Sequence, residues 1–143
     1  MNSAGPRISC WLQCARPPSR GTLLDVSLRC VIVDDNAFFL EAATSLLERE
    51  GVTVVAVASN SAEATGKVRE LHPDVVLVDI MLGKESGFDL ARELASSNAD
   101  HTAIILISTR AEADFTGLIA QTPAAGFVPK SELSASAIRR LLG

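Results

Sequence analysis

Five short apolar runs, rich in valine and isoleucine, alternate with amphipathic stretches from about residue 28 onward, and this alternation constrains the fold most strongly. The runs span residues 28–33, 52–58, 74–80, 103–108 and 126–129. Their nearly continuous hydrophobicity is typical of strands that are covered on both faces. Strands and helices in alternation, joined by right-handed crossovers, form a parallel sheet with helices on both faces. The sequence therefore predicts an α/β fold, a doubly wound five-stranded parallel sheet flanked by five helices.

The helices are predicted from apolar spacing and from residues that start or stop helices. The first begins near Ala37 and ends at Gly51, with an apolar stripe of Phe39, Ala42, Ala43, Leu46 and Leu47. The second spans about residues 61–71, with Ser61 as its N-cap, and ends before Pro73. The other three span about residues 87–97, 111–120 and 134–142, and the stripe of the fourth helix is Ala111, Phe115, Leu118 and Ile119.

Size and composition indicate one globular domain without a membrane span. The chain has 143 residues, of which 48% are hydrophobic and 21% charged, and its net charge of −4 argues against a nucleic-acid interface. No apolar run approaches the roughly 20 residues that a membrane span requires. The odd number of cysteines (Cys10, Cys14 and Cys30) indicates reduced thiols in a cytoplasmic protein.

The first 26 residues differ from the rest in composition. They contain three prolines, and their charged residues are three arginines and one aspartate. The segment shows no sustained apolar periodicity. This segment is interpreted as a disordered tail or as an extension from a start codon placed too early. Residues 27–143 are the predicted folded domain.

Polar residues stand at the carboxyl ends of four of the five predicted strands. Asp34 and Asp35 follow the first strand, Asp79 ends the third, Ser108 ends the fourth, and Lys130 follows the fifth. Because ligands of such sheets bind at the carboxyl ends of the strands, these side chains are expected to converge on one rim. Three close carboxylates are unfavourable without a cation, and an all-oxygen site suits Mg²⁺.

Helix capping is the simpler explanation for an aspartate after a strand. Asp35 or Asn36 could cap the first helix, but one cap suffices and does not explain two adjacent acids. Capping explains Asp79 poorly, because Gly83 and Gly87 mark a loop after it. Metal binding is therefore the preferred interpretation of the three acids.

At this point the chain resembles the receiver domain of two-component response regulators. The motifs that carry the resemblance are "VIVDDN", "PDVVLVDIMLGKESGFDL", "IILIST" and "AAGFVPK". The resemblance covers about residues 28–143 and implies a flavodoxin-like strand order, 2-1-3-4-5. It makes residues 27–143 a receiver domain whose function is phosphorylation-dependent signalling.

The resemblance also implies roles for the rim residues. Asp79 is the phosphoacceptor, and it shares a Mg²⁺ ion with Asp34, Asp35 and the backbone carbonyl of Met81. Asp35 is expected to be the more direct ligand of the acidic pair. The phosphoryl donor is a sensor histidine kinase or a phosphotransfer protein.

The resemblance also implies that Ser108 and Phe127 form a switch. Ser108 and Lys130 would contact the phosphoryl group, and Phe127 would rotate into space that Ser108 vacates. The change would bias a two-state surface over residues 111–142, which binds an unknown downstream protein. A homodimer is left open, and neither membrane nor direct nucleic-acid contact is expected.

Three other readings compete with the signalling one. A haloacid-dehalogenase-type phosphohydrolase needs a second aspartate two residues after the nucleophile, where this chain has Met81. A phosphorylation-independent interaction module has no physical reason to keep three repelling carboxylates. A DNA-binding regulator would need a further domain, and nothing follows Gly143 in this sequence. We therefore expect no enzyme activity beyond the chain's own phosphotransfer and dephosphorylation.

Overall fold

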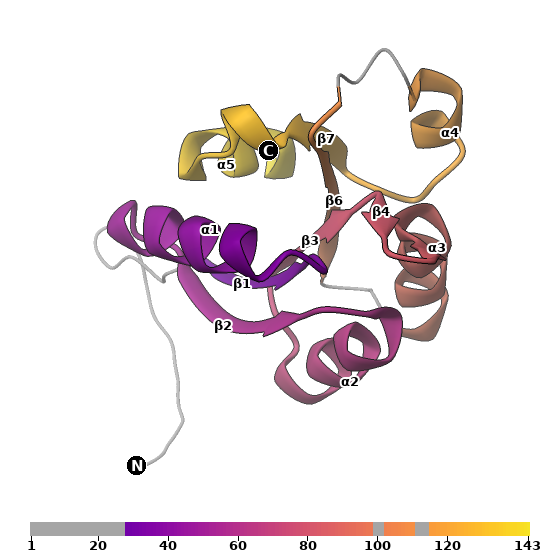
Figure 1. Ribbon diagram of the computed structural model, residues 1–143, viewed down its shortest axis with the longest axis horizontal. Helices are drawn as coiled ribbons and strands as arrows, with labels where there is room; N and C mark the ends of the chain where they lie inside the picture. Colours follow the sequence, from indigo (N-terminus) through magenta and orange to yellow (C-terminus); the bar gives the residue numbers. More distant parts are fainter. Residues whose placement is uncertain (1–27, 99–101, 111–114) are drawn as a thin grey trace.

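A five-stranded parallel sheet forms the centre of the computed structural model, which describes residues 28–98, 102–110 and 115–143. Its strands are β1 (Arg29–Val33), β2 (Thr53–Ala58), β3 (Val75–Asp79), β6 (Ala103–Ser108) and β7 (Gly126–Pro129). They are ordered β2-β1-β3-β6-β7, and all their pairings are parallel (Figure 1). This order confirms the predicted fold class.

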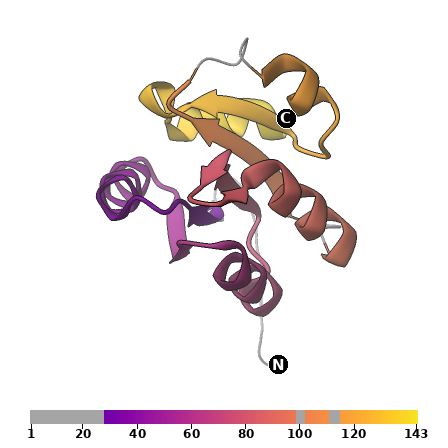
Figure 2. The same ribbon diagram turned by 45° about the vertical axis from the view of Figure 1, so that its right-hand side comes forward.

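Helices cover both faces of this sheet. They are α1 (Ala37–Arg49), α2 (Ser61–Leu71), α3 (Gly87–Asn98), α4 (Thr116–Ala120) and α5 (Ala135–Leu142). The helices α1 and α5 lie on one face, whereas α2 and α3 lie side by side on the other (Figure 2). Each face has its own cluster of buried apolar side chains. Within the described ranges, no helix has the length and apolar character needed to cross a membrane.

Side-chain caps fix the starts of α1 and α2. The Asn36 carboxamide accepts hydrogen bonds from the backbone N–H groups of Phe38 and Phe39, so the capping role falls to Asn36 and leaves Asp35 free. The prediction of Ser61 as the cap of α2 is wrong. The residue before it, Asn60, accepts from the backbone N–H of Glu63 at 2.9 Å, which makes Ser61 the first helical residue.

Two predicted helix stripes are too wide. Ala42 is exposed because α1 contacts the sheet through a narrower stripe that contains Phe39, Ala43 and Leu47. Leu118 is 46% exposed, because α4 has only five residues and faces the core through Ile119. Ala111, a predicted member of the fourth helix, lies outside the described residues.

A short antiparallel hairpin follows β3, where the sequence predicts a loop. It consists of β4 (Met81–Leu82) and β5 (Glu85–Ser86), and Gly83 in its turn has a φ of +60°. The Glu85 carboxylate accepts a hydrogen bond from the backbone N–H of Ser61 at 2.8 Å. The hairpin is thereby joined to the start of α2, and it borders the carboxyl end of the sheet.

Cys30 is the one free cysteine within the described part of the chain, and it is buried in β1. Burial raises the pKa of its thiol to about 12, so the thiol stays protonated at neutral pH. Cys10, Cys14 and the rest of the predicted tail lie outside the described residues.

Candidate functional site

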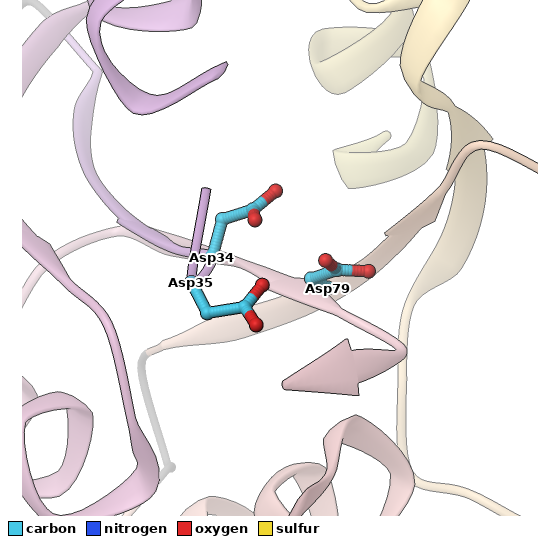
Figure 3. Close-up of side chains that lie close together, drawn as sticks. All are labelled: Asp34, Asp35 and Asp79. Atoms are coloured by element: carbon cyan, nitrogen blue, oxygen red, sulfur yellow. The ribbon is translucent and has the colours of Figure 1, made fainter. Parts of the chain in front are cut away.

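The three predicted acids meet at the carboxyl end of the sheet. Val33 pairs with Val78, so the residues that follow them, Asp34 and Asp79, emerge side by side from neighbouring strands. One carboxylate oxygen from each of these two residues and from Asp35 can be chosen so that all three lie within 4.8 Å of one another. Figure 3 shows the three carboxylates gathered around one small region.

The three carboxylates differ in exposure. Asp34 is fully buried, Asp79 is 7% exposed, and Asp35 is exposed. The position of Asp34 is fixed twice, because its backbone N–H donates to the carbonyl of Ala58 at 3.0 Å and its Oδ1 accepts from the backbone N–H of Asn36 at 2.8 Å. Asp34 is thus held rigidly at the floor of the site, while Asp35 faces solvent at its mouth.

Lys130 brings a positive charge into this cluster. It directly follows β7, and its Nζ lies 2.5 Å from Oδ2 of Asp34 and 3.2 Å from Oδ2 of Asp79. Within the described residues, Asp34 Oδ2 accepts no hydrogen bond of regular geometry, so the ion pair compensates its burial. Burial alone would lower the pKa of Lys130, but the close contact with Asp34 and the charges of both carboxylates outweigh it and raise that pKa.

Asp79 has a perturbed carboxyl group. Its Oδ1 accepts a hydrogen bond from the backbone N–H of Met81 at 3.2 Å. Burial raises the pKa of Asp79, and the charge of Asp34 adds to the effect, while the Met81 hydrogen bond and Lys130 oppose it. The pKa of Asp79 lies above its ordinary value as a result. Perturbed ionisable groups of this kind concentrate at functional sites.

The two residues predicted as a switch lie at different depths. Ser108 is buried at the end of β6, one residue beyond Ile107, the partner of Asp79, and its hydroxyl accepts from the backbone N–H of Arg110 at 3.0 Å. Phe127 lies on β7 and is buried in the apolar cluster between the sheet and the helices α2 and α3. The centroids of the Phe127 and Phe115 rings are 6.4 Å apart. Ser108 therefore belongs to the rim, whereas Phe127 lies behind it.

Sequence reasoning missed one residue of the site. The ring of Phe39, in the first turn of α1, lies beneath the Lys130 ammonium, with Nζ 4.4 Å from the ring centroid. The apolar spacing of the sequence places Phe39 only in the buried stripe of its helix. Its spacing from Asp35 was the available signal, because a residue in the first turn of this helix lies next to the same rim.

The donor set suits a hard divalent cation. All three ligand side chains offer carboxylate oxygens, which Mg²⁺ prefers. If the three carboxylates are ionised, the Lys130 ammonium offsets one of their charges, and the described residues pair no second cation with the cluster. The exposed side of Asp35 leaves room for water or for a substrate oxygen, as Mg²⁺ sites require. The residues present therefore fit Mg²⁺.

Comparisons with known proteins identify the family of this chain. A profile of the response regulator receiver domain family matches residues 30–141. Response regulator GacA of Pseudomonas viridiflava is 32% identical over 104 residues, which cover 72% of this chain and 48% of GacA. Protein-glutamate methylesterase/protein-glutamine glutaminase 5 of Myxococcus xanthus is 34% identical over 104 residues, 72% of this chain and 30% of that protein. A LuxR-family two-component response regulator from Aurantimonas sp. SI85-9A1 shares the fold with a TM-score of 0.71 at 28% identity, over 80% of this chain and 81% of that structure.

The chain spans about half the length of GacA and under a third of the methylesterase. What it shares with both is the receiver portion, which in two-component systems binds Mg²⁺ at acidic residues and takes part in phosphorelay. The match over residues 30–141 shows that the chain belongs to the response regulator receiver domain family.

Proposed function

We propose that this chain is a phosphorylation-controlled signalling receiver in which Asp79 accepts a phosphoryl group. The observation that carries the proposal is the convergence of Asp79 with two other carboxylates and the Lys130 ammonium at one end of the sheet. The donor is a phosphohistidine of a sensor histidine kinase or of a phosphotransfer protein. The folded domain is residues 27–143, it acts in the cytoplasm, and it has no catalytic activity beyond its own phosphotransfer and dephosphorylation.

Asp34, Asp35 and Asp79 would hold a Mg²⁺ ion together with the backbone carbonyl of Met81. When bound, Mg²⁺ offsets negative charge on the carboxylates and on the incoming phosphoryl oxygens. The rigid hold on Asp34 and the exposure of Asp35 support a division of labour. Asp34 fixes the floor of the site, and Asp35 is the more direct ligand.

The transfer itself is a substitution at phosphorus. One carboxylate oxygen of Asp79 forms the new O–P bond while the P–N bond of the donor breaks, and the bonding electron pair stays on the imidazole nitrogen. The Asp79 carboxylate attacks in its ionised form, which the hydrogen bond from the Met81 backbone N–H and the contact with Lys130 favour. Lys130, already in contact with this carboxylate, offsets charge on the phosphoryl oxygens.

Phosphorylation then acts as a switch. The product adds nearly two negative charges to the rim. The Ser108 hydroxyl turns from its present contact with the backbone of Arg110 and donates to a phosphoryl oxygen, and Phe127 adjusts behind it. The change biases a surface over residues 111–142 that binds a downstream protein.

The test is incubation with acetyl phosphate and Mg²⁺, followed by intact-mass measurement. The wild type is expected to gain the mass of one phosphoryl group, and chelation of Mg²⁺ should prevent the gain. Asp79→Asn should gain nothing, whereas Asp89→Asn, an exposed acid on α3, should behave as the wild type does. Phosphoryl transfer to Asp79→Asn at the wild-type rate would refute the assignment.

A further inference from the structure

We propose that Phe39 is a positioning residue, which holds the Lys130 ammonium over the acidic cluster for phosphoryl transfer. The inference rests on the proposed function, because it concerns how Lys130 reaches the phosphoryl group. Among the described residues, Lys130 Nζ lies close to three partners: Asp34 Oδ2 at 2.5 Å, Asp79 Oδ2 at 3.2 Å and the Phe39 ring centroid at 4.4 Å. Two of these partners are charged, and the third is an aromatic face that attracts a cation through its quadrupole.

The ring of Phe39 is held in place by the start of α1. The Asn36 carboxamide, which caps the helix directly after the acidic pair, accepts a hydrogen bond from the backbone N–H of Phe39 at 3.2 Å. The side chain is partly buried and packs against the apolar cluster beneath α1 and α5. The face that Phe39 presents to Lys130 is therefore fixed by the same turn that presents Asp35.

Lys130 needs such a support more than the carboxylates do. Its ammonium ends a flexible four-carbon stem, whereas Asp34 and Asp79 have short side chains that the strand ends and nearby backbone groups orient. The Lys130 side chain is only 13% exposed, so the ring also covers the ammonium from solvent. Restricting the stem lowers the entropic cost of placing the charge during the reaction.

An aromatic face also suits a cation that must change partners. Lys130 pairs with both carboxylates in the structure, and it must donate to phosphoryl oxygens when they arrive at Asp79. A third carboxylate in the place of Phe39 would compete for the N–H groups of the ammonium. The ring accepts no regular hydrogen bond, so the ammonium can stay above it while its N–H groups turn toward the phosphoryl group.

The neighbouring Phe38 provides a matched control. It belongs to the same helical turn but is 86% exposed. Phe39→Leu removes the aromatic face and retains an apolar side chain, Phe39→Met does the same with an unbranched chain, and Phe39→Tyr restores the ring. Phe38→Leu makes the same chemical change at a position outside the site. Phe39→Met keeps the test decisive if Phe39→Leu fails to fold.

Two measurements test the proposal. The first is the proton chemical shift of the lysine ε-CH₂ groups in lysine-labelled protein, where Lys67, Lys84 and Lys130 give three signals and Lys130→Met assigns one of them. The Lys130 signal should be shifted upfield by the ring in the wild type, in Phe39→Tyr and in Phe38→Leu, and should return to an ordinary value in Phe39→Leu. The second is the rate of phosphorylation by acetyl phosphate at saturating Mg²⁺. This rate should fall about three- to tenfold in Phe39→Leu and Phe39→Met. It should change less than about twofold in Phe39→Tyr and Phe38→Leu.

The outcomes separate this inference from the proposed function. An unchanged rate in Phe39→Leu, beside an active wild type, overturns the inference alone. So does a Lys130 shift that is the same in the wild type and in Phe39→Leu. If the wild type takes no phosphoryl group under any condition, the proposed function fails, and the positioning role in transfer fails with it.

Discussion

The two ends of the central sheet differ in how their charged side chains are paired. At the amino end, the backbone N–H of Arg29 donates to the Asp74 carboxylate at 2.9 Å, and the Arg29 guanidinium donates to the carbonyls of Leu71 and His72 at 2.8 and 3.1 Å. Each of these charged side chains is thus paired with a backbone group, and the guanidinium also caps the end of α2. Among the described residues, the hydrogen bonds of Arg29 and Asp74 connect β1 to the α2–β3 turn, and we call this end of the sheet the balanced end because both charged groups are satisfied.

The carboxyl end holds a charge imbalance at closer range. Within the described residues, three carboxylates lie close together there and the Lys130 ammonium pairs with two of them, Asp34 and Asp79. Burial and the charge of Asp34 raise the pKa of Asp79. Such an arrangement costs stability unless a further cation joins it. The comparison teaches that satisfied polar contacts at one end stabilise the fold, while the charge imbalance at the other end distinguishes the candidate site.

The strongest way to break the comparison is Lys130→Met. Removing the ammonium leaves Asp34 fully buried without its ion-pair partner and lets the carboxylates repel one another. The free energy of unfolding in a chelating buffer should fall by about 3 kcal/mol, as measured by urea denaturation. The double variant Asp34→Asn/Lys130→Met should recover more than half of this loss. A loss below about 1 kcal/mol would show that the carboxyl end is not strained by charge.

Arg29→Met tests the balanced end. The variant loses two charged hydrogen bonds to the carbonyls at the end of α2, at a site that is partly exposed. The free energy of unfolding should fall by about 1 to 2 kcal/mol. The rate of phosphorylation by acetyl phosphate should stay at the wild-type value, because no group of the rim is altered. A large loss of phosphorylation in a folded Arg29→Met protein would contradict the division between the two ends.

Asp79→Asn should give the smallest change in the free energy of unfolding, and this change is a gain, whereas Lys130→Met and Arg29→Met lose stability. Because the pKa of Asp79 is raised in the folded state, folding favours the protonated carboxyl, and stability is lost as the pH rises from the unfolded pKa to the folded pKa. Without Mg²⁺, the variant should be more stable than the wild type by about 1 kcal/mol at neutral pH.

The advantage of Asp79→Asn should shrink as the pH falls toward the unfolded value of an aspartate, where both proteins are neutral at this position. Urea denaturation at a series of pH values measures the difference. If Asp79→Asn is the less stable protein at neutral pH, the contact of Asp79 with Lys130 outweighs its repulsion from Asp34, and the account of the carboxyl end is wrong.

The sequence was sufficient to predict the convergence at this rim for a simple reason. Parallel strands expose their carboxyl ends on one side, so Asp34 after β1 and Asp79 at the end of β3 had to be neighbours. The β-branched runs also identified all five strands of the sheet to within one residue, because buried strands leave a continuous apolar signal.

Other features depended on tertiary contacts that periodicity does not encode. The β4–β5 hairpin has strands of two residues, too short for any alternation to be seen. The cap of α2 could be assigned to either of two adjacent polar residues, and only the hydrogen bond from Glu63 identifies Asn60. The placement of Phe39 beneath Lys130 joins the first helix to the last strand, and an apolar stripe gives no sign of such a contact.

The most direct test of the central claim is the dependence of unfolding free energy on Mg²⁺ concentration. If the imbalance at the carboxyl end is a cation site, the wild type should gain stability with Mg²⁺ according to its binding constant. Asp74→Asn, at the balanced end, should gain as much, whereas Asp35→Asn should gain much less. A wild type whose stability does not respond to Mg²⁺, or an Asp35→Asn variant that responds equally, would contradict the account.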